Sequence, residues 1–126
     1  MIDHLSIPVR DLAASTGLYA AALAPLGLVR LVERAATVGF GRRYPEFWLN
    51  HRPGLTPAPP DSGHHLCLRA PDEAAVRAFH AAALARGCRS GGDPGPRQAA
   101  ITAYYAAFIV DPDGNRLEAA CFPRPA

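Results

Sequence analysis

The stretch HLSIPVRDLAASTGLYAAALA, residues 4–24, returns in altered form as HLCLRAPDEAAVRAFHAAALA at residues 65–85. Ten of the 21 positions are identical at this offset of 61 residues. Alanine accounts for six of the ten matches, but the pairs His4 with His65 and Asp11 with Asp72 do not follow from an alanine-rich composition. We therefore predict an internal duplication in which each copy forms one supersecondary unit.

Each copy begins with the pattern of a strand followed by a helix. Residues 2–9 are short, alternating and rich in β-branched residues, which predicts a strand, and residues 64–69 take the same place in the second copy. Asp11 and Asp72 then stand where a helix N-cap belongs, and helices are predicted over residues 12–24 and 73–86. Three more strands are expected in each copy, at residues 28–33, 36–41 and 46–50 and at residues 88–90, 104–110 and 116–122.

A proline-rich segment separates the two copies. Residues 52–62 contain four prolines, which exclude a helix or a central strand and predict a semi-rigid linker. The expected architecture is therefore α+β, one domain over residues 1–126 with modules at about 1–51 and 63–122. Residues 91–98 are expected to form a loop beside the mouth of any pocket. The sequence Asp111-Pro112-Asp113-Gly114-Asn115 predicts a turn that joins the last two strands as a hairpin.

The composition narrows the classes of partner. Apolar residues make up 49% of the chain and charged residues 19%, which is typical of a folded globular protein. The arginines are scattered and the net charge is only +2, so no basic stripe for nucleic acid is expected. No apolar run approaches the roughly 20 residues that cross a bilayer, and the N-terminus lacks the features of a signal peptide. Cys67, Cys88 and Cys121 are interpreted as free thiols, which favours the cytoplasm.

Three residues form a candidate metal site. Alternate strand residues share one face, so His4 and His65 occupy matching positions in the two copies, with His64 as the rival to His65. Glu118 is acidic within an otherwise apolar terminal strand, where a buried carboxylate needs a partner. Two histidines and one carboxylate suit Fe(II), and also accept Mn, Ni, Co or Zn. The open positions on such a metal would bind two adjacent substrate oxygens.

The segments around His4, around His65 and over residues 111–118 resemble three hallmark segments of the glyoxalase / bleomycin-resistance / extradiol-dioxygenase superfamily, the vicinal oxygen chelate fold. The resemblance covers nearly the whole chain. It implies two tandem βαβββ modules forming a curled, half-barrel mixed sheet around a cleft, and a homodimer. It also implies His4, His65 and Glu118 as metal ligands and a catalytic role for Glu118. In lactoylglutathione lyases the fourth strand supplies a further carboxylate, where this sequence has Trp48, so the pattern is closer to the extradiol dioxygenases.

Several side chains are candidates for contact with a substrate. Trp48, Tyr104, Tyr105 and Phe108 are aromatic residues on predicted strands, and Arg43 is a cation that either grips an anionic substrate or lies on a solvated turn. Because neighbouring strand residues face opposite sides, at most one of the two tyrosines lines the cleft.

The sequence leads to one principal hypothesis and one alternative. The principal hypothesis is a small metalloenzyme acting on a small molecule that chelates a divalent metal through vicinal oxygens. Its reaction is either lyase or isomerase chemistry through an enolate, or ring-opening dioxygenation. The alternative is a metal-free protein of the bleomycin-resistance type, which sequesters a small molecule, and the tryptophan at a ligand position suits that hypothesis. A purely structural or interaction domain is the third and least favoured hypothesis.

Overall fold

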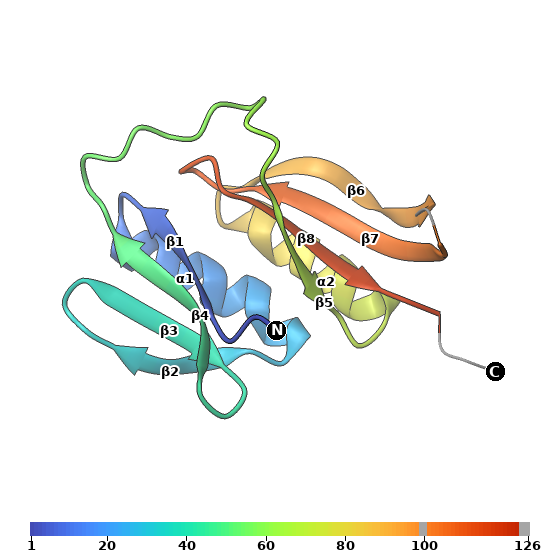
Figure 1. The fold of residues 1–126 in the computed structure, drawn as a ribbon, viewed down its shortest axis with the longest axis horizontal. Helices are drawn as coiled ribbons and strands as arrows, with labels where there is room; N and C mark the ends of the chain where they lie inside the picture. The colour runs from blue at the N-terminus through green and yellow to red at the C-terminus, as the bar shows by residue number, and fades with distance from the viewer. Residues whose placement is uncertain (99–100, 124–126) are drawn as a thin grey trace.

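The computed structural model describes residues 1–98 and 101–123, and they form two βαβββ modules (Figure 1). The first module consists of β1 (Leu5–Val9), α1 (Leu12–Leu23), the short 3-10 helix η1 (Ala24–Leu26), β2 (Val29–Glu33), β3 (Thr37–Gly41) and β4 (Pro45–His51). The second consists of β5 (Leu66–Arg69), α2 (Glu73–Ala85), β6 (Arg89–Gln98), β7 (Ala103–Val110) and β8 (Arg116–Cys121). The α+β architecture of two tandem modules is thus confirmed.

Each module carries its own four-stranded mixed sheet. The strand orders are β1-β4-β3-β2 in the first sheet, called sheet A, and β5-β8-β7-β6 in the second, called sheet B. In both sheets the first strand pairs with the last in parallel, and the other pairs are antiparallel. The two sheets remain separate, so the curled surface implied by the resemblance is an open arrangement of two sheets.

The aspartates predicted as helix caps occupy that position in both modules. The Asp11 carboxylate accepts a hydrogen bond from the Ala14 amide at 3.0 Å, and Asp72 accepts from the Ala75 amide at 2.8 Å. These bonds satisfy amide groups that have no partner within the helix. The equivalent caps set the position at which each helix begins after the first strand of its module. The two copies therefore fold in the same way at this point.

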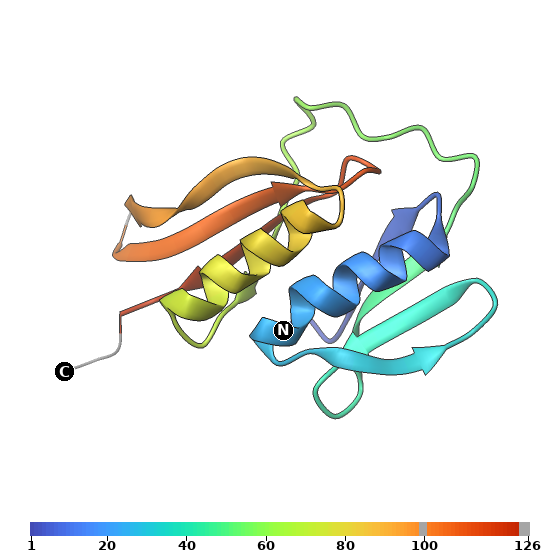
Figure 2. The same cartoon turned by 180° about the vertical axis from the view of Figure 1, so that it is seen from behind.

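One apolar core joins the two modules. Helices α1 and α2 lie side by side on the same side of the two sheets (Figure 2). The buried cluster draws on both helices and on one face of each sheet, with Ile7, Val9, Leu18, Tyr19, Phe47, Leu49, Phe79, Ile109 and Leu117 among its members. The opposite face of each sheet is covered by no helix in the described residues (Figure 1), and these uncovered faces are called the open faces below.

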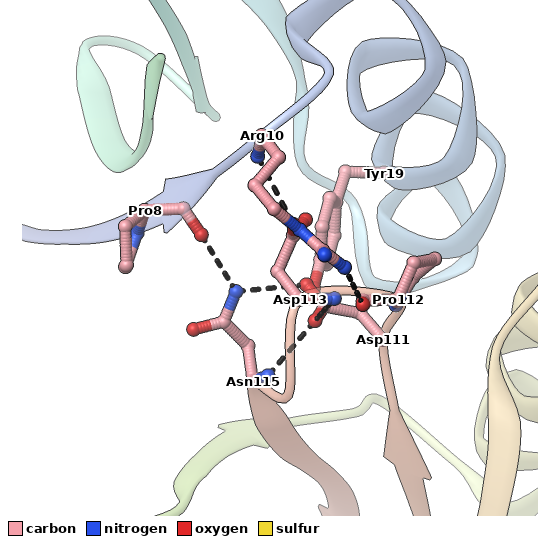
Figure 3. A network of polar contacts seen from close by, with 7 residues as sticks. All are labelled: Pro8, Arg10, Tyr19, Asp111, Pro112, Asp113 and Asn115. Atoms are coloured by element: carbon pink, nitrogen blue, oxygen red, sulfur yellow. Dashed lines mark hydrogen bonds and ion pairs between the residues drawn. The ribbon is translucent and has the colours of Figure 1, made fainter. Parts of the chain in front are cut away.

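The predicted turn at residues 111–115 is confirmed, and it also connects the modules (Figure 3). Gly114 has a φ of 84°, which favours glycine at this turn position. Several hydrogen bonds hold the turn to the first module. They include those from Tyr19 Oη to Asp111 Oδ2 at 2.6 Å, from Arg10 Nε to Asp113 Oδ1 at 2.8 Å, and from Asn115 Nδ2 to the Pro8 carbonyl at 2.9 Å. Polar contacts therefore fix the second module against the end of β1 and against α1.

Residues 91–98, predicted as a loop, belong to the ten-residue strand β6. This strand pairs with β7 from Arg89 to Gln98, with register shifts between Ser90 and Gly92 and between Gly92 and Gly95. It lies at the edge of sheet B, where prolines are tolerated because only one side of the strand must donate hydrogen bonds. The glycines and prolines that predicted a loop instead produce a bulged edge strand.

No helix of the described residues is both long enough and apolar enough to span a membrane.

Candidate functional site

The candidate site lies on the open face of sheet B and is organised around Glu118. Cross-strand pairing places Cys67 beside Glu118, Glu118 beside Phe108, and Phe108 beside Gly92. Cross-strand partners share a face, so these four residues form a row across all four strands. A thiol, a carboxylate and an aromatic ring are thereby brought from distant parts of the chain to one row.

Glu118 and His65 are in direct contact. The Nε2 atom of His65 lies 3.0 Å from Oε1 of Glu118. The carboxylate is buried, with only 4% of the residue exposed, while nearly half of the His65 side chain is accessible. The Oε2 atom of Glu118 is buried and has no hydrogen-bond partner within the part of the chain that the structure describes.

A buried carboxylate oxygen without a donor is costly, by roughly 1–3 kcal/mol or more for a charged group. A cation bound at this position would relieve that cost. The neighbouring imidazole nitrogen and the carboxylate oxygen are both ligands that divalent transition metals accept. The residues of sheet B therefore fit part of a metal site, with two donors on a surface that remains accessible from the His65 side.

Two other polar groups on this face are held in their protonated forms. Burial of the thiol, together with the charge of Glu118, raises the pKa of Cys67 to about 12. Burial and the same carboxylate also raise the pKa of Tyr104. Near neutral pH, Cys67 and Tyr104 are thus neutral donors beside the Glu118 carboxylate, and a hydrogen bond to that carboxylate contributes to the raised pKa of each.

His4 lies on the other sheet. It precedes β1 and is exposed, and its Nδ1 atom lies 2.7 Å from Oδ2 of Asp3. Within the described residues, no three histidine, cysteine or acidic side chains lie close enough to hold a metal ion together. The structure therefore joins His65 with Glu118 but does not bring His4 to them within one chain. The physical reason is that the two open faces belong to separate sheets, which are not closed around a common point.

The register of sheet A shows what occupies the place equivalent to Glu118. Ser6 pairs with Trp48 in sheet A as Cys67 pairs with Glu118 in sheet B. The offset of 61 residues relates Ser6 to Cys67, so Trp48 stands where the duplication places a carboxylate. The indole lies in a shallow groove with His4 and Ser6, and the Arg34 guanidinium carbon is 5.6 Å from its ring centroid. This face of sheet A offers an aromatic surface and a single histidine.

The other predicted substrate contacts separate into two groups. Phe108 and Tyr104 lie on the same open face as Glu118; the Phe108 ring centroid is 6.0 Å from that of His65, and the Tyr104 ring is stacked on that of Phe122 at 5.2 Å. The prediction for Tyr105 requires correction. Its hydroxyl accepts a hydrogen bond from Arg77 of α2, so Tyr105 faces the helix and cannot line the same surface as Tyr104. Arg43 is exposed in the turn between β3 and β4 of the first module, whereas the Glu118 row lies in the second.

Three arginines on the Glu118 face were not among the predicted site residues. The Arg97 guanidinium carbon lies 5.7 Å from the Phe108 ring centroid, and that of Arg69 lies 4.9 Å from the Phe122 centroid. Arg116 lines a cavity beside His65 and Phe108. Alternation from His65 would have indicated Arg69, and alternation from Glu118 would have indicated Arg116. Arg97 was hidden because its segment was predicted to be a loop.

Comparisons with known proteins were made on sequence and on structure. Residues 1–119 match the family model of the Glyoxalase/Bleomycin resistance protein/Dioxygenase superfamily. None of the curated proteins compared with the chain matched it.

Solved structures repeat the same architecture. A glyoxalase/bleomycin resistance protein from Albidiferax ferrireducens T118 is 31% identical, with 94% of this chain and 97% of that chain covered and a TM-score of 0.81. A bleomycin-binding protein complexed with bleomycin is 26% identical, with coverages of 94% and 95% and a TM-score of 0.58. The family match over nearly the whole length and the common architecture agree, and the chain belongs to the glyoxalase/bleomycin resistance protein/dioxygenase superfamily.

Proposed function

We propose that this protein is a metal-dependent enzyme acting on a small molecule. Its divalent metal would be held by His65 and Glu118 of one chain and by His4 of a second copy. The observation that carries the proposal is the buried Oε2 atom of Glu118, which lacks a donor although the same carboxylate contacts an accessible imidazole.

A second copy of the chain is needed because the donor atoms lie on two different sheets. His4 is exposed on sheet A, and His65 is accessible on sheet B, so each can contact a neighbouring molecule. In a dimer with twofold symmetry, a contact from surface A to surface B is repeated from B to A. Sheet A of each chain would then face sheet B of its partner, which gives two equivalent sites with three protein donors each.

The residues around such a site would have different roles. A bound divalent metal would polarise two vicinal oxygens of the substrate. Glu118 would accept a proton from the substrate, since it is a carboxylate in a largely desolvated position. Tyr104 and Phe108 would exclude water from that side of the site. The reaction would be lyase or isomerase chemistry, or ring-opening dioxygenation.

Metal binding is tested with chelator-treated protein titrated with Ni²⁺, Mn²⁺ and Zn²⁺, and with Fe²⁺ under anaerobic conditions. We expect wild type to bind one of these ions stoichiometrically and the variants H4A, H65A and E118Q to lose that binding. The variant H51A, which changes a histidine of β4 outside the site, is the matched control. Equal metal binding by all five proteins would refute the proposal.

Mixing variants tests whether the site is shared between chains. In a heterodimer of H4A and H65A, one of the two shared sites contains only intact ligands. Random mixing should therefore restore about a quarter of the sites, although neither variant binds metal alone. A site within one chain would gain nothing from mixing, so an unchanged mixture would exclude the shared arrangement.

A second function is favoured by Trp48, which occupies the register position equivalent to Glu118. An indole in place of a carboxylate suits a surface that binds a planar ligand without metal, as in a sequestering protein of the bleomycin-resistance type. The test is the fluorescence of Trp48, the single tryptophan, during titration with bleomycin in the presence of chelator. Saturable quenching that added metal does not change would favour this function over the enzyme. Because W48L lacks the fluorophore, its binding of bleomycin is measured by calorimetry, which should show weaker binding than in wild type.

A further inference from the structure

A cavity of about 230 Å³ lies beside His65, between the linker and the turn end of the hairpin β7–β8. Its polar side chains are those of His64, His65 and Arg116, and of these the Arg116 guanidinium is the fixed cation. Its apolar wall includes the ring of Phe108, with Ile109 and Val110 beyond it. A cavity whose lining combines an aromatic wall with a guanidinium group and no acidic side chain is suited to an anion that carries an apolar part.

The charge of the surrounding face is also positive. Among the described residues, no carboxylate forms an ion pair with Arg69, Arg97 or Arg116. The nearby Asp93 carboxylate accepts from Ser90 at 2.8 Å instead. Glu118 is the one acidic residue in the row, and it is already in contact with His65. An incoming anion would therefore meet guanidinium groups that have no acidic partner in this part of the chain.

Two glycines of β6 leave room for the ring of Phe108. A Cβ atom at Gly91 would lie 3.2 Å from Cβ of Phe108, and one at Gly92 would lie 3.1 Å from its Cδ2. Both separations are tight, so glycine at these positions gives the ring its room. Arg97 lies over this ring, and its Nη2 atom donates to the Asp93 carbonyl at 2.7 Å, which orients the guanidinium. The aromatic wall is therefore positioned by the strand behind it.

We propose that this cavity binds the anionic end of a small planar carboxylate, with Arg116 holding the carboxylate and Phe108 packing against the ring. The proposal deepens the proposed function, because the bound molecule would lie next to His65 and Glu118 and would be its substrate class. An arginine donates two parallel hydrogen bonds to a carboxylate, which a neutral amide of the same shape cannot accept in the same way. The site should therefore discriminate by charge as well as by shape.

The test uses benzoate and benzamide, which have the same ring and differ in charge, with acetate and inorganic phosphate as further probes. Binding to the chelator-treated full chain is followed by calorimetry and by NMR shifts of Phe108. We expect wild type to bind benzoate about tenfold or more tightly than benzamide, acetate or phosphate. The variant R116Q should lose that preference, R116K should recover part of it, and F108L should bind benzoate no better than acetate.

The control is R30Q, which removes an exposed arginine of the first module paired with Glu33. It should bind benzoate as wild type does, and thermal unfolding establishes that every variant is folded. Absence of benzoate binding to wild type, equal binding of benzoate and benzamide, or full benzoate affinity in R116Q would each overturn the proposal. Because chelator is present throughout, a failed metal titration does not affect this result, and a failed benzoate titration does not affect the metal proposal.

Discussion

The Nε atom of Arg10 donates to Oδ1 of Asp113 at 2.8 Å, although 103 positions separate the two residues in the chain. The backbone amide of Arg10 donates to the same oxygen at 3.0 Å. One buried carboxylate in the second module thus accepts two hydrogen bonds from the segment between β1 and α1 (Figure 3). The relative placement of the modules depends on such polar contacts as well as on the shared core.

Replacement of Asp113 by alanine should weaken the whole domain. The change leaves the Arg10 amide and guanidinium without their acceptor, and we expect a loss of about 1–3 kcal/mol in the free energy of unfolding. Urea denaturation measures this loss. The control is E33A, which breaks the exposed ion pair with Arg30 and should cost less than about 1 kcal/mol. Similar losses of unfolding free energy in both variants would show that the contact between the modules stabilises the protein no more than an exposed ion pair does.

Tyr19 should make the protein sensitive to alkali. Burial, followed by the charge of Asp111, raises the pKa of Tyr19 well above its ordinary 10.0. The folded state therefore keeps the phenolic proton when the unfolded state loses it. This contribution to stability is fully present below the unfolded pKa and is lost as the pH rises above it. Because the folded state then holds a proton that the unfolded state has lost, the free energy of unfolding should fall as the pH rises above ~10.

The variant Y19F separates this effect from other groups, since the buried thiol of Cys88, with a pKa raised to about 12, acts in the same direction. Y19F loses the hydrogen bond to Asp111 and should be about 1 kcal/mol less stable at neutral pH. Its stability should decline less steeply with alkali than that of wild type. Parallel pH profiles for the two proteins would contradict the assignment to Tyr19.

Gly114, the glycine of the turn at residues 111–115, should be sensitive to substitution. Its φ of 84° lies where side chains are strained, and a Cβ atom would approach the Ala58 carbonyl oxygen to 3.0 Å. G114A should therefore destabilise the protein by about 1–2 kcal/mol and disturb the contact between turn and linker. G54A is the matched control in the linker, because a Cβ atom there meets nothing within 4 Å. Thermal unfolding with equal midpoints for both variants would refute this account.

The sequence predicted those features that depend on local pattern. The repeat of residues 4–24 and 65–85 located both caps and both helices, because these follow from spacing and alternation along one strand or helix. Alternation also separated Tyr104 from Tyr105, and only the burial of one face against α2 decided that Tyr104 shares the face of Glu118.

The features that depend on the placement of whole modules were not available from sequence. Alternation indicates the face on which His4 and His65 lie, but it carries no information on the angle between two separate sheets. The strand at residues 91–98 was missed because edge position and bulges tolerate the glycines and prolines that ordinarily predict a loop. Arg97 was missed for the same reason.

Removal of metal gives the remaining prediction, and it rests on the unpaired oxygen of Glu118. If a divalent ion binds there, it stabilises the folded chain by mass action, by about 2.7 kcal/mol at a hundredfold excess over the dissociation constant. Thermal unfolding of wild type should therefore shift upward with added metal and return with chelator, whereas E118Q should not respond. In the absence of metal, E118Q should be at least as stable as wild type, since glutamine removes a buried charge that lacks a full set of donors. A chelator-treated E118Q protein with an unfolding temperature well below that of wild type would contradict this prediction. It would show that the contact between His65 and Glu118 stabilises the fold without a bound cation.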